Sequence, residues 1–456
     1  MIPCALDQQD LRGGDVTRWE LDATSLEAWT RAPVDPRPPS YDQLGRLHED
    51  PDGEAEWSAW IGLSVLLPEA TTESVRQTLT EWFRQHESLR SQLRLVDGEP
   101  VRRTLEAEDV AFTPAPLGEH DADELRELLQ REFNAGCRPT RQPACVFFTV
   151  AAEHGHVLHA AFDHITFDGL SAYSGVGAIA GLHTAIISGM HEPQTSPSYV
   201  DSTAPEISFG ESTTPDDPRL EPWRDFVRSG SVPGAPPEST IDPGASYDHG
   251  LVRHEICDGD LAARLDLCYA TEGIPTGMLW TAILMQAIGG DPHVLMSTHG
   301  RPSSLWIESV GWFAGVAPLA LSLPADAETR DWVVEGNRVW REVAPAAALP
   351  LGLVQSLLEV PMEPQIVLSI IDGSRIDGHE WWRTLGSRIH LGDVPPSSQT
   401  HVWLTILPEG VSLVTRLPEA PDSRTWLDGV AERFARIVEA EAARALPVDS
   451  LQEATA

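Results

Sequence analysis

Apolar residues recur along the first part of the chain with two different periods. Spacings of three and four residues give one apolar face in three segments, which we expect to be helices: 72–90, 121–133 and 169–188. Short apolar runs bounded by turn-forming residues predict strands: 61–67, 93–95, 145–152 and 157–162. The last two runs flank Glu153-His154-Gly155-His156, so we predict that they form a β-hairpin.

The same two patterns return in the C-terminal half. Helices are predicted from 260, over 276–288 and from 423, and strands near 252 and at 294–298, 316–323, 366–371, 401–407 and 411–417. Between the halves, residues 191–250 are rich in Pro, Ser, Thr, Gly and Asp, interrupted at 220–227. We therefore predict an α/β fold, layered as in α+β proteins, with an N-terminal lobe (1–190), a connection (191–250) and a C-terminal lobe (251–456).

Composition narrows the function classes. The 456 residues suffice for two domains with their own cores. The net charge of −37 argues against a nucleic-acid partner, because phosphate binding needs a basic surface. Five scattered cysteines without a Cys-x-x-Cys pair favour reduced thiols, and neither a membrane span nor a secretory signal is recognisable. We expect a cytoplasmic protein without a bound metal.

The segment Asp163-His164-Ile165-Thr166-Phe167-Asp168-Gly169 is the main candidate for chemistry. A His that follows an apolar strand can take a proton from an attacking amine or alcohol. A nearby Asp can fix the local backbone, and a Gly permits a sharp turn with an accessible amide. These features predict a site for acyl transfer at His164, Asp168 and Gly169.

Spacing alone does not select this segment, because His-x-x-x-Asp-Gly occurs three times in the chain. His48 precedes an acidic segment rich in turn formers, which favours a solvated loop. His254 lies in a polar strand candidate, and Asp258 after it is better interpreted as the start of a helix. His164 alone ends a strongly apolar strand and precedes a helix of small residues.

Several segments together resemble one known family. Those that carry the resemblance are Arg84-Gln85-His86-Glu87-Ser88-Leu89-Arg90, Asp163 to Gly169, Gly300-Arg301-Pro302, Val310-Gly311-Trp312-Phe313 and Pro318-Leu319. In this order they resemble nonribosomal peptide condensation domains. Trp19-Glu20-Leu21, Gly311-Trp312-Phe313 and Ser369-Ile370-Ile371-Asp372 are similar to the free-standing polyketide-associated acyltransferases of actinobacteria.

The resemblance implies two lobes of the chloramphenicol acetyltransferase type, which form a V around a central tunnel. His164 would lie in the middle as the general base or as the group that positions the nucleophile. Asp168 would be structural and paired with an Arg, for which Arg301 is the candidate. Gly169 would present its N–H to the oxyanion.

Two positions depart from the family pattern. Asp163 replaces the first His of the usual double-His motif, and Gly315-Val316 stands where an Asn is common. An acidic neighbour can change the pKa or the hydrogen bonding of His164. We place Asp163, Gly311, Trp312 and Phe313 along the substrate tunnel.

Three function hypotheses follow. The first is a free-standing acyltransferase of specialised metabolism, monomeric, that moves an acyl or aminoacyl group from a carrier-protein or coenzyme A thioester to an amine or hydroxyl acceptor. The thioester is then a substrate, and no cofactor is needed. The second is a condensation-like protein that does not acylate, either an epimerase or a platform that binds a carrier protein. The third is a binder of lipids or small ligands between the lobes.

Overall fold

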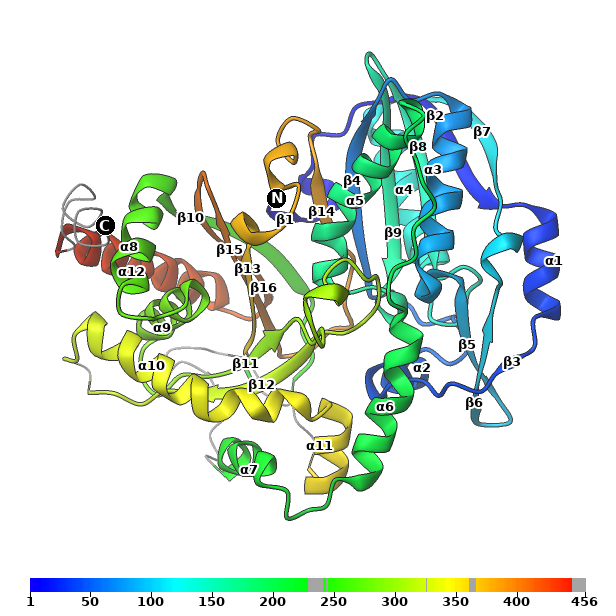
Figure 1. Cartoon of the computed structure of the whole chain (residues 1–456). Coiled ribbons are helices and arrows are strands. Elements are labelled where there is room, and N and C mark those ends of the chain that lie inside the picture. Colours follow the sequence, from blue (N-terminus) through cyan, green and yellow to red (C-terminus); the bar gives the residue numbers. More distant parts are fainter. Residues whose placement is uncertain (229–240, 243–244, 325, 361–365, 445–456) are drawn as a thin grey trace.

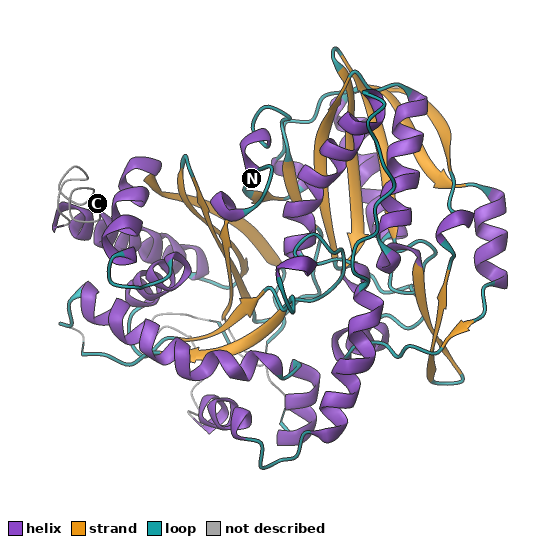
Figure 2. Cartoon of the chain, viewed as in Figure 1, coloured by secondary structure: helices purple, strands orange, loops and turns teal. Residues whose placement is uncertain are grey.

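Two β-sheets, each with its own helices, organise the chain in a computed structural model that describes residues 1–228, 241–242, 245–324, 326–360 and 366–444. Figure 1 shows the two sheets side by side. Helices and strands occur in both bodies (Figure 2). The mixed α/β architecture predicted from the apolar periods is therefore confirmed.

The first body is built on a seven-stranded sheet. Its strands, in spatial order, are β1 (Pro3–Cys4), β14 (Arg388–Leu391), β4 (Trp60–Pro68), β9 (Gly155–Asp163), β8 (Cys145–Ala152), β2 (Gly14–Leu21) and β7 (Phe112–His120). Helices α3 (Thr72–Gln85) and α5 (Gly169–Ile187) cover one face, and α4 (Ala122–Gly136) covers the other. Alternate residues of β8 serve the two faces: Phe147 packs with the α3 and α5 core and Phe148 with the α4 core.

The second body is built on a six-stranded mixed sheet. The order is β10 (His249–Asp258), β16 (Gly410–Pro418), β15 (Thr400–Leu407), β13 (Ile366–Asp372), β11 (His293–Thr298) and β12 (Gly315–Ala320). Four helices pack on one face: α8 (Gly259–Ala270), α9 (Thr276–Ile288), α10 (Thr329–Val343) and α12 (Ser423–Arg444). Val402, Leu404 and Leu368 point into this helical core, so the residues that alternate with them face the opposite side.

Shorter elements complete the fold. A three-stranded sheet contains β3 (Val34–Asp35), β6 (Glu99–Thr104) and β5 (Ser91–Val96), and the helices α1 (Ala23–Arg31), α2 (Tyr41–Glu49) and α11 (Leu351–Leu358) lie outside the two large sheets. The helix predicted over 72–90 ends at Gln85 because His86 is extended, and a 3₁₀ turn follows it.

The connection predicted at 191–250 is more structured than its composition suggested. It contains α6 (Tyr199–Ser212) and α7 (Glu221–Arg228), while residues 229–240 lie outside the described part of the chain. Polar residues and Pro205 interrupt the apolar spacing in α6 by which a helix is recognised from the sequence. Hydrogen bonds from two buried residues hold α6 in place: the Tyr199 hydroxyl donates to Ser40 Oγ, and the Thr203 hydroxyl donates to Pro38 O.

The boundary at 251–456 also needs a correction, because β14 belongs to the first sheet. Residues 388–391 pair with β4 in antiparallel fashion and with β1 in parallel fashion. A buried hydrogen-bonded chain supports this crossing: the Ser64 hydroxyl lies 2.7 Å from His159 Nδ1 and 2.6 Å from His390 Nε2. The C-terminal half therefore completes the N-terminal sheet.

Helix α5 is long and apolar enough to cross a membrane by length and composition alone. The apolar composition of α5 is explained by its place within the protein, because it packs on β4 and on α3. Ala172, Val176 and Ile179 are fully buried in the first core. These contacts are those of a core helix.

Candidate functional site

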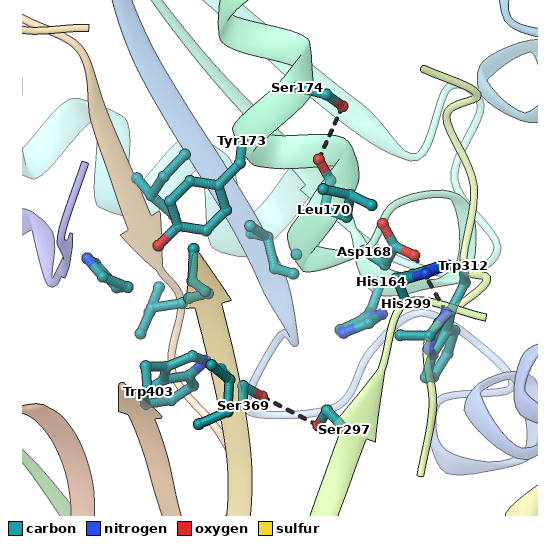
Figure 3. Close-up of a pocket in the computed structure, with 18 of the residues that line it drawn as sticks. His164, Asp168, Leu170, Tyr173, Ser174, Ser297, His299, Trp312, Ser369 and Trp403 are labelled. Carbon is teal, nitrogen blue, oxygen red and sulfur yellow. Dashed lines mark hydrogen bonds between the residues drawn. The ribbon is translucent and has the colours of Figure 1, made fainter. Parts of the chain in front are cut away.

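A cavity of about 1050 Å³ lies between the two sheets. The first body contributes residues of β4, α5 and β14, and the second contributes residues of β11, β12, β13, β15 and β16. His164, Asp168 and Gly169 all line this cavity. Figure 3 shows His164 and Asp168 beneath α5, with Trp312 and His299 beside them.

His164 is held where β9 ends. The strand continues to Asp163, whose carboxylate then accepts the Ile165 N–H at 2.9 Å and starts a 3₁₀ turn. The His164 N–H donates to Ala59 O at 3.1 Å, which ties the turn to the neighbouring chain segment. The imidazole packs against Trp312, with 4.1 Å between the ring centroids. Backbone and ring are therefore both fixed beside the cavity.

The imidazole of His164 is neutral at physiological pH. Burial lowers its pKa to about 4, although the Asp168 charge and the residue's own backbone carbonyl oppose that shift. A neutral imidazole carries a free lone pair on one nitrogen. The group can therefore accept a proton from a substrate without first losing one.

Asp168 and Arg301 form a buried ion pair between the two halves of the chain. Arg301 Nη1 lies 2.8 Å from Asp168 Oδ2, and Arg301 Nη2 lies 2.9 Å from Oδ1. Neither side chain is exposed to solvent. The carboxylate also accepts the N–H groups of Ser171, Phe313 and Ala314 at 2.8, 3.0 and 3.2 Å.

This network keeps Asp168 ionised. Burial alone would raise the pKa of the carboxyl, but Arg301 and the donated hydrogen bonds outweigh it and hold the pKa below its ordinary value. Bidentate pairing also fixes the orientation of both groups. Both oxygens of Asp168 already accept hydrogen bonds from protein groups, so the carboxylate is not placed to take a proton from a substrate. Asp168 therefore supports the turn.

Gly169 begins α5 and is exposed to the cavity. Asp168 caps the helix through the Ser171 N–H, so the amide of Gly169 belongs to the first turn, whose N–H groups have no partner within the helix. A helix N-terminus favours negative charge. No atom lies within 4 Å of the position where a Cβ of residue 169 would stand. The backbone is therefore open to a reacting group.

Asp163 does not line the cavity, contrary to the prediction from its place in the motif. Its side chain is fully buried and pairs with Arg46, with 2.7 Å between Arg46 Nη2 and Asp163 Oδ2. A buried carboxylate needs such a partner, and Arg46 of α2 supplies it. Asp163 therefore supports the turn of His164 and is not a tunnel residue.

Of the other three predicted tunnel residues, Trp312 lines the cavity and two do not. Gly311 packs so closely on Tyr199 that a Cβ would stand 2.4 Å from the Tyr199 ring. Phe313 covers the guanidinium of Arg301, with 4.7 Å between Cζ and the ring centroid. Both residues therefore shape the wall behind Trp312.

The other motif copies lie elsewhere. His48 is exposed in the last turn of α2, a helix where the sequence suggested a loop. His254 lies on β10 and bonds Asp428 of α12 at 2.8 Å. Asp258 caps α8, as its position before the helix predicted. None of these three residues lines the cavity.

Several cavity residues were missed from the sequence. Tyr173 follows Gly169 by one helical turn, and its hydroxyl is buried beside the cavity. Ser297, Ser369 and Trp403 line the floor, and Ser369 donates to Ser297 at 3.0 Å (Figure 3). The sequence could have indicated these floor residues, because they alternate along their strands with apolar residues that are buried in the core.

Comparison with known proteins gives the family. Residues 56–372 match the Condensation domain family, and the chain belongs to that family. It is 28% identical over 313 residues to a probable nonribosomal peptide synthetase, CymA, of Salinispora arenicola; the match covers 64% of this chain and 4% of that protein. The chain therefore spans a small part of that relative.

Solved structures share the fold. The PapA2 acyl transferase superposes with a TM-score of 0.84 at 17% identity, covering 97% of this chain and 100% of that one. The epimerization domain from the third module of tyrocidine synthetase B superposes with a TM-score of 0.69 at 14% identity, covering 90% and 98%. The two-lobed fold of the chloramphenicol acetyltransferase type is thereby shown.

Buried histidines give a prediction for the pH dependence of stability. Burial lowers the pKa of five of them to between about 3 and about 4, from about 6.5 in an unfolded chain: His86, His159, His164, His390 and His401. The unfolded state binds more protons between these values, so the free energy of unfolding falls as the pH drops below about 6.5. Each group contributes at most about 1.4 kcal/mol per pH unit.

Chemical denaturation at pH 7.5, 6.5, 5.5 and 4.5 measures this effect. We expect these groups to cause a smaller loss between the first two values and a steeper loss below them. His390→Gln combined with His159→Gln should flatten the acid limb. Burial raises the pKa of Asp42 to about 7 and that of Asp163 and Asp266 to about 6, which opposes the histidine effect in this window. A difference in the free energy of unfolding between the unmodified protein and the double variant that stays constant down to pH 4.5 would contradict the assignment of neutral buried rings.

Proposed function

We propose that this protein is an acyltransferase that moves an acyl or aminoacyl group from a carrier-protein or coenzyme A thioester to an amine or hydroxyl acceptor, in the cytoplasm and as a monomer. One observation carries the proposal: a neutral imidazole, His164, is fixed at the wall of a large cavity between two lobes. Such a cavity can hold a donor and an acceptor together, which converts a bimolecular encounter into an oriented reaction.

The chemistry follows from the groups at this point. The acceptor's nitrogen or oxygen attacks the thioester carbonyl, and His164 accepts its proton as the new C–N or C–O bond forms. The resulting oxyanion is stabilised by the amide at the start of α5, at Gly169. Collapse breaks the C–S bond, and the proton held by His164 leaves with the thiol. Asp168 and Arg301 hold the turn during these steps.

An epimerase is the second candidate function, because an epimerization domain shares the fold. In that reaction His164 would remove an α-proton from an aminoacyl thioester and return it to the other face, with no acceptor. The two candidates differ in their products. Acyl transfer consumes an acceptor, whereas epimerization exchanges an α-hydrogen with solvent.

The test combines both readouts in one experiment. The protein is incubated in D₂O with aminoacyl and fatty-acyl thioesters of coenzyme A and of a carrier protein, with and without a panel of amines and alcohols. We expect acceptor-dependent amide or ester products by mass spectrometry, which are lost in His164→Ala. Deuterium at the α-carbon without any acceptor product would assign the epimerase, and neither product would contradict both proposals.

A further inference from the structure

Arg416 is a buried cation at the cavity wall that the proposed chemistry does not use. It lies on β16, opposite His401 of β15, on the face of the sheet that turns away from the helices. Arg416 and His401 both line the cavity that holds His164. Arg416 is 9% exposed, and its Nη2 donates a hydrogen bond to Gly392 O at 2.6 Å.

Other buried arginines in the described residues have their charge or their donors matched. Arg46, Arg138 and Arg301 each lie within 4.0 Å of a carboxylate oxygen. Arg102 has no carboxylate but donates to four acceptors: Arg37 O, Pro38 O, Ser91 Oγ and Gln43 Oε1. Within the described part of the chain, Arg416 has neither kind of match. A buried guanidinium of this kind can recognise an oxyanion.

The groups around Arg416 leave its charge in place. His401 is neutral, because burial and, to a smaller extent, the positive charge of Arg416 together lower its pKa to about 3. Trp403 offers its ring at 5.7 Å from the guanidinium carbon, an aromatic neighbour without charge. Asp393 acts on Arg416 through its charge, but it is exposed and lies beyond 4.0 Å. The nearest surroundings are therefore polar or aromatic, not anionic.

Part of the cavity wall is apolar, while acidic residues line other parts of it: Asp42, Glu308, Asp372, Asp377, Glu380 and Asp393. Val367, Leu295 and Val316 line the apolar part from the second sheet, and Ile61 and Ile389 line it from the first. An alkyl chain fits such a wall, because burying its surface against these side chains is favourable. An alkyl chain that ends in an oxygen-acid group would match both the apolar wall and the guanidinium of Arg416.

We propose that the acyl donor bound in this cavity carries an anionic oxygen-acid group, a carboxylate or a sulfo group, which Arg416 binds. This inference rests on the proposed acyl transfer and deepens it by naming the donor class. Arg416 acts as a specificity-determining residue.

Binding of matched thioesters tests this proposal. The probes are pantetheine thioesters of a straight-chain monoacid and of the dicarboxylic acid of equal length, from four to twelve carbons, plus the corresponding ω-sulfo acids. Affinities are measured by calorimetry on the His164→Ala protein, which keeps the thioester intact. Since a hydrogen bond to a charged group contributes about 1.5–3 kcal/mol, we expect the anionic member of at least one pair to bind about 10- to 100-fold more tightly.

Two second-site variants separate recognition from structure. Arg416→Gln should reduce that preference to about one, and Arg416→Lys should keep part of it. Arg375→Gln is the matched control, because Arg375 also lines the cavity but is 71% exposed and paired with Asp372. It should leave the preference unchanged. Since the readout is a ratio within one variant, a loss of stability from the bond to Gly392 does not imitate the result.

Each outcome decides one statement. No preference in any pair, or a preference that survives Arg416→Gln, overturns the anion site. If instead 6-aminohexanoate is preferred over hexylamine as the acceptor in an Arg416-dependent way, and no donor pair shows a preference, the donor assignment is wrong. An Arg416-dependent preference without acyl transfer to any acceptor would keep this site and contradict the proposed function. Acyl transfer to an acceptor without any such preference would support the proposed function and contradict the anion site.

Discussion

Replacing His164 with Ala is expected to reduce kcat by about 10²–10⁴-fold, the usual contribution of a general base. The variant loses the imidazole that packs against Trp312 beside the start of α5. Because the ring has no partner for its buried Nδ1 among other described residues, its removal breaks no side-chain hydrogen bond there. The melting temperature should therefore change little, and steady-state kinetics together with a melting curve check both statements.

The controls are the other copies of the motif. His254→Ala and His48→Ala should change kcat by less than about twofold, since neither residue lines the cavity. His254→Ala loses a bond to Asp428 and should affect stability slightly, because that pair is partly exposed. If either control variant lost as much activity as His164→Ala, the choice of the second motif copy would be wrong.

Elements with a long local pattern could be predicted from the sequence. The helix expected over 276–288 matches α9, because apolar residues surround it on every side and Pro275 and Gly289 bound it. The hairpin of β8 and β9 was recognised in the same way, since Gly155 with a φ of 143° marks its turn. In each case the neighbouring residues alone determine the element.

Elements held by distant contacts could not be predicted. Strand β14 has four residues and pairs with β4, more than 300 positions earlier in the chain, so no local period announces it. The pair Asp168 and Arg301 spans 133 positions and was suggested by the family resemblance, not by spacing. Arg416 gave a signal that was not used: a charged residue within an apolar strand marks a face that is not part of the core.

The tunnel residues show the same limit. Asp163 and Phe313 stand next to His164 and Trp312 in sequence, and adjacency suggested that they share the cavity. Neighbours in an extended segment point to opposite sides, so one of each pair faces the cavity and the other packs behind it. Their partners, Arg46 and Arg301, decide which side is the buried one.

Replacing Asp168 with Ala is expected to destabilise the protein by about 3–5 kcal/mol, the typical cost of breaking a buried ion pair. The substitution leaves the Arg301 guanidinium without its carboxylate. It also leaves the N–H groups of Ser171, Phe313 and Ala314 without an acceptor. Because the pair joins α5 to the segment before β12, its loss should also loosen the turn of His164 and lower activity. Denaturant unfolding and kinetics on the same preparation measure the two effects.

Asp168→Asn is the matched variant. It keeps the size of the side chain and one acceptor oxygen, but it loses the charge and turns the second oxygen into a donor that faces Arg301. We therefore expect a smaller loss of stability than in Asp168→Ala, with activity falling in parallel. An Asp168→Ala protein that unfolds like the unmodified one but is inactive would contradict the structural role and move Asp168 into the proton-transfer step. Equal loss in both variants would instead show that the charge of Asp168, and not its shape, holds Arg301 in place.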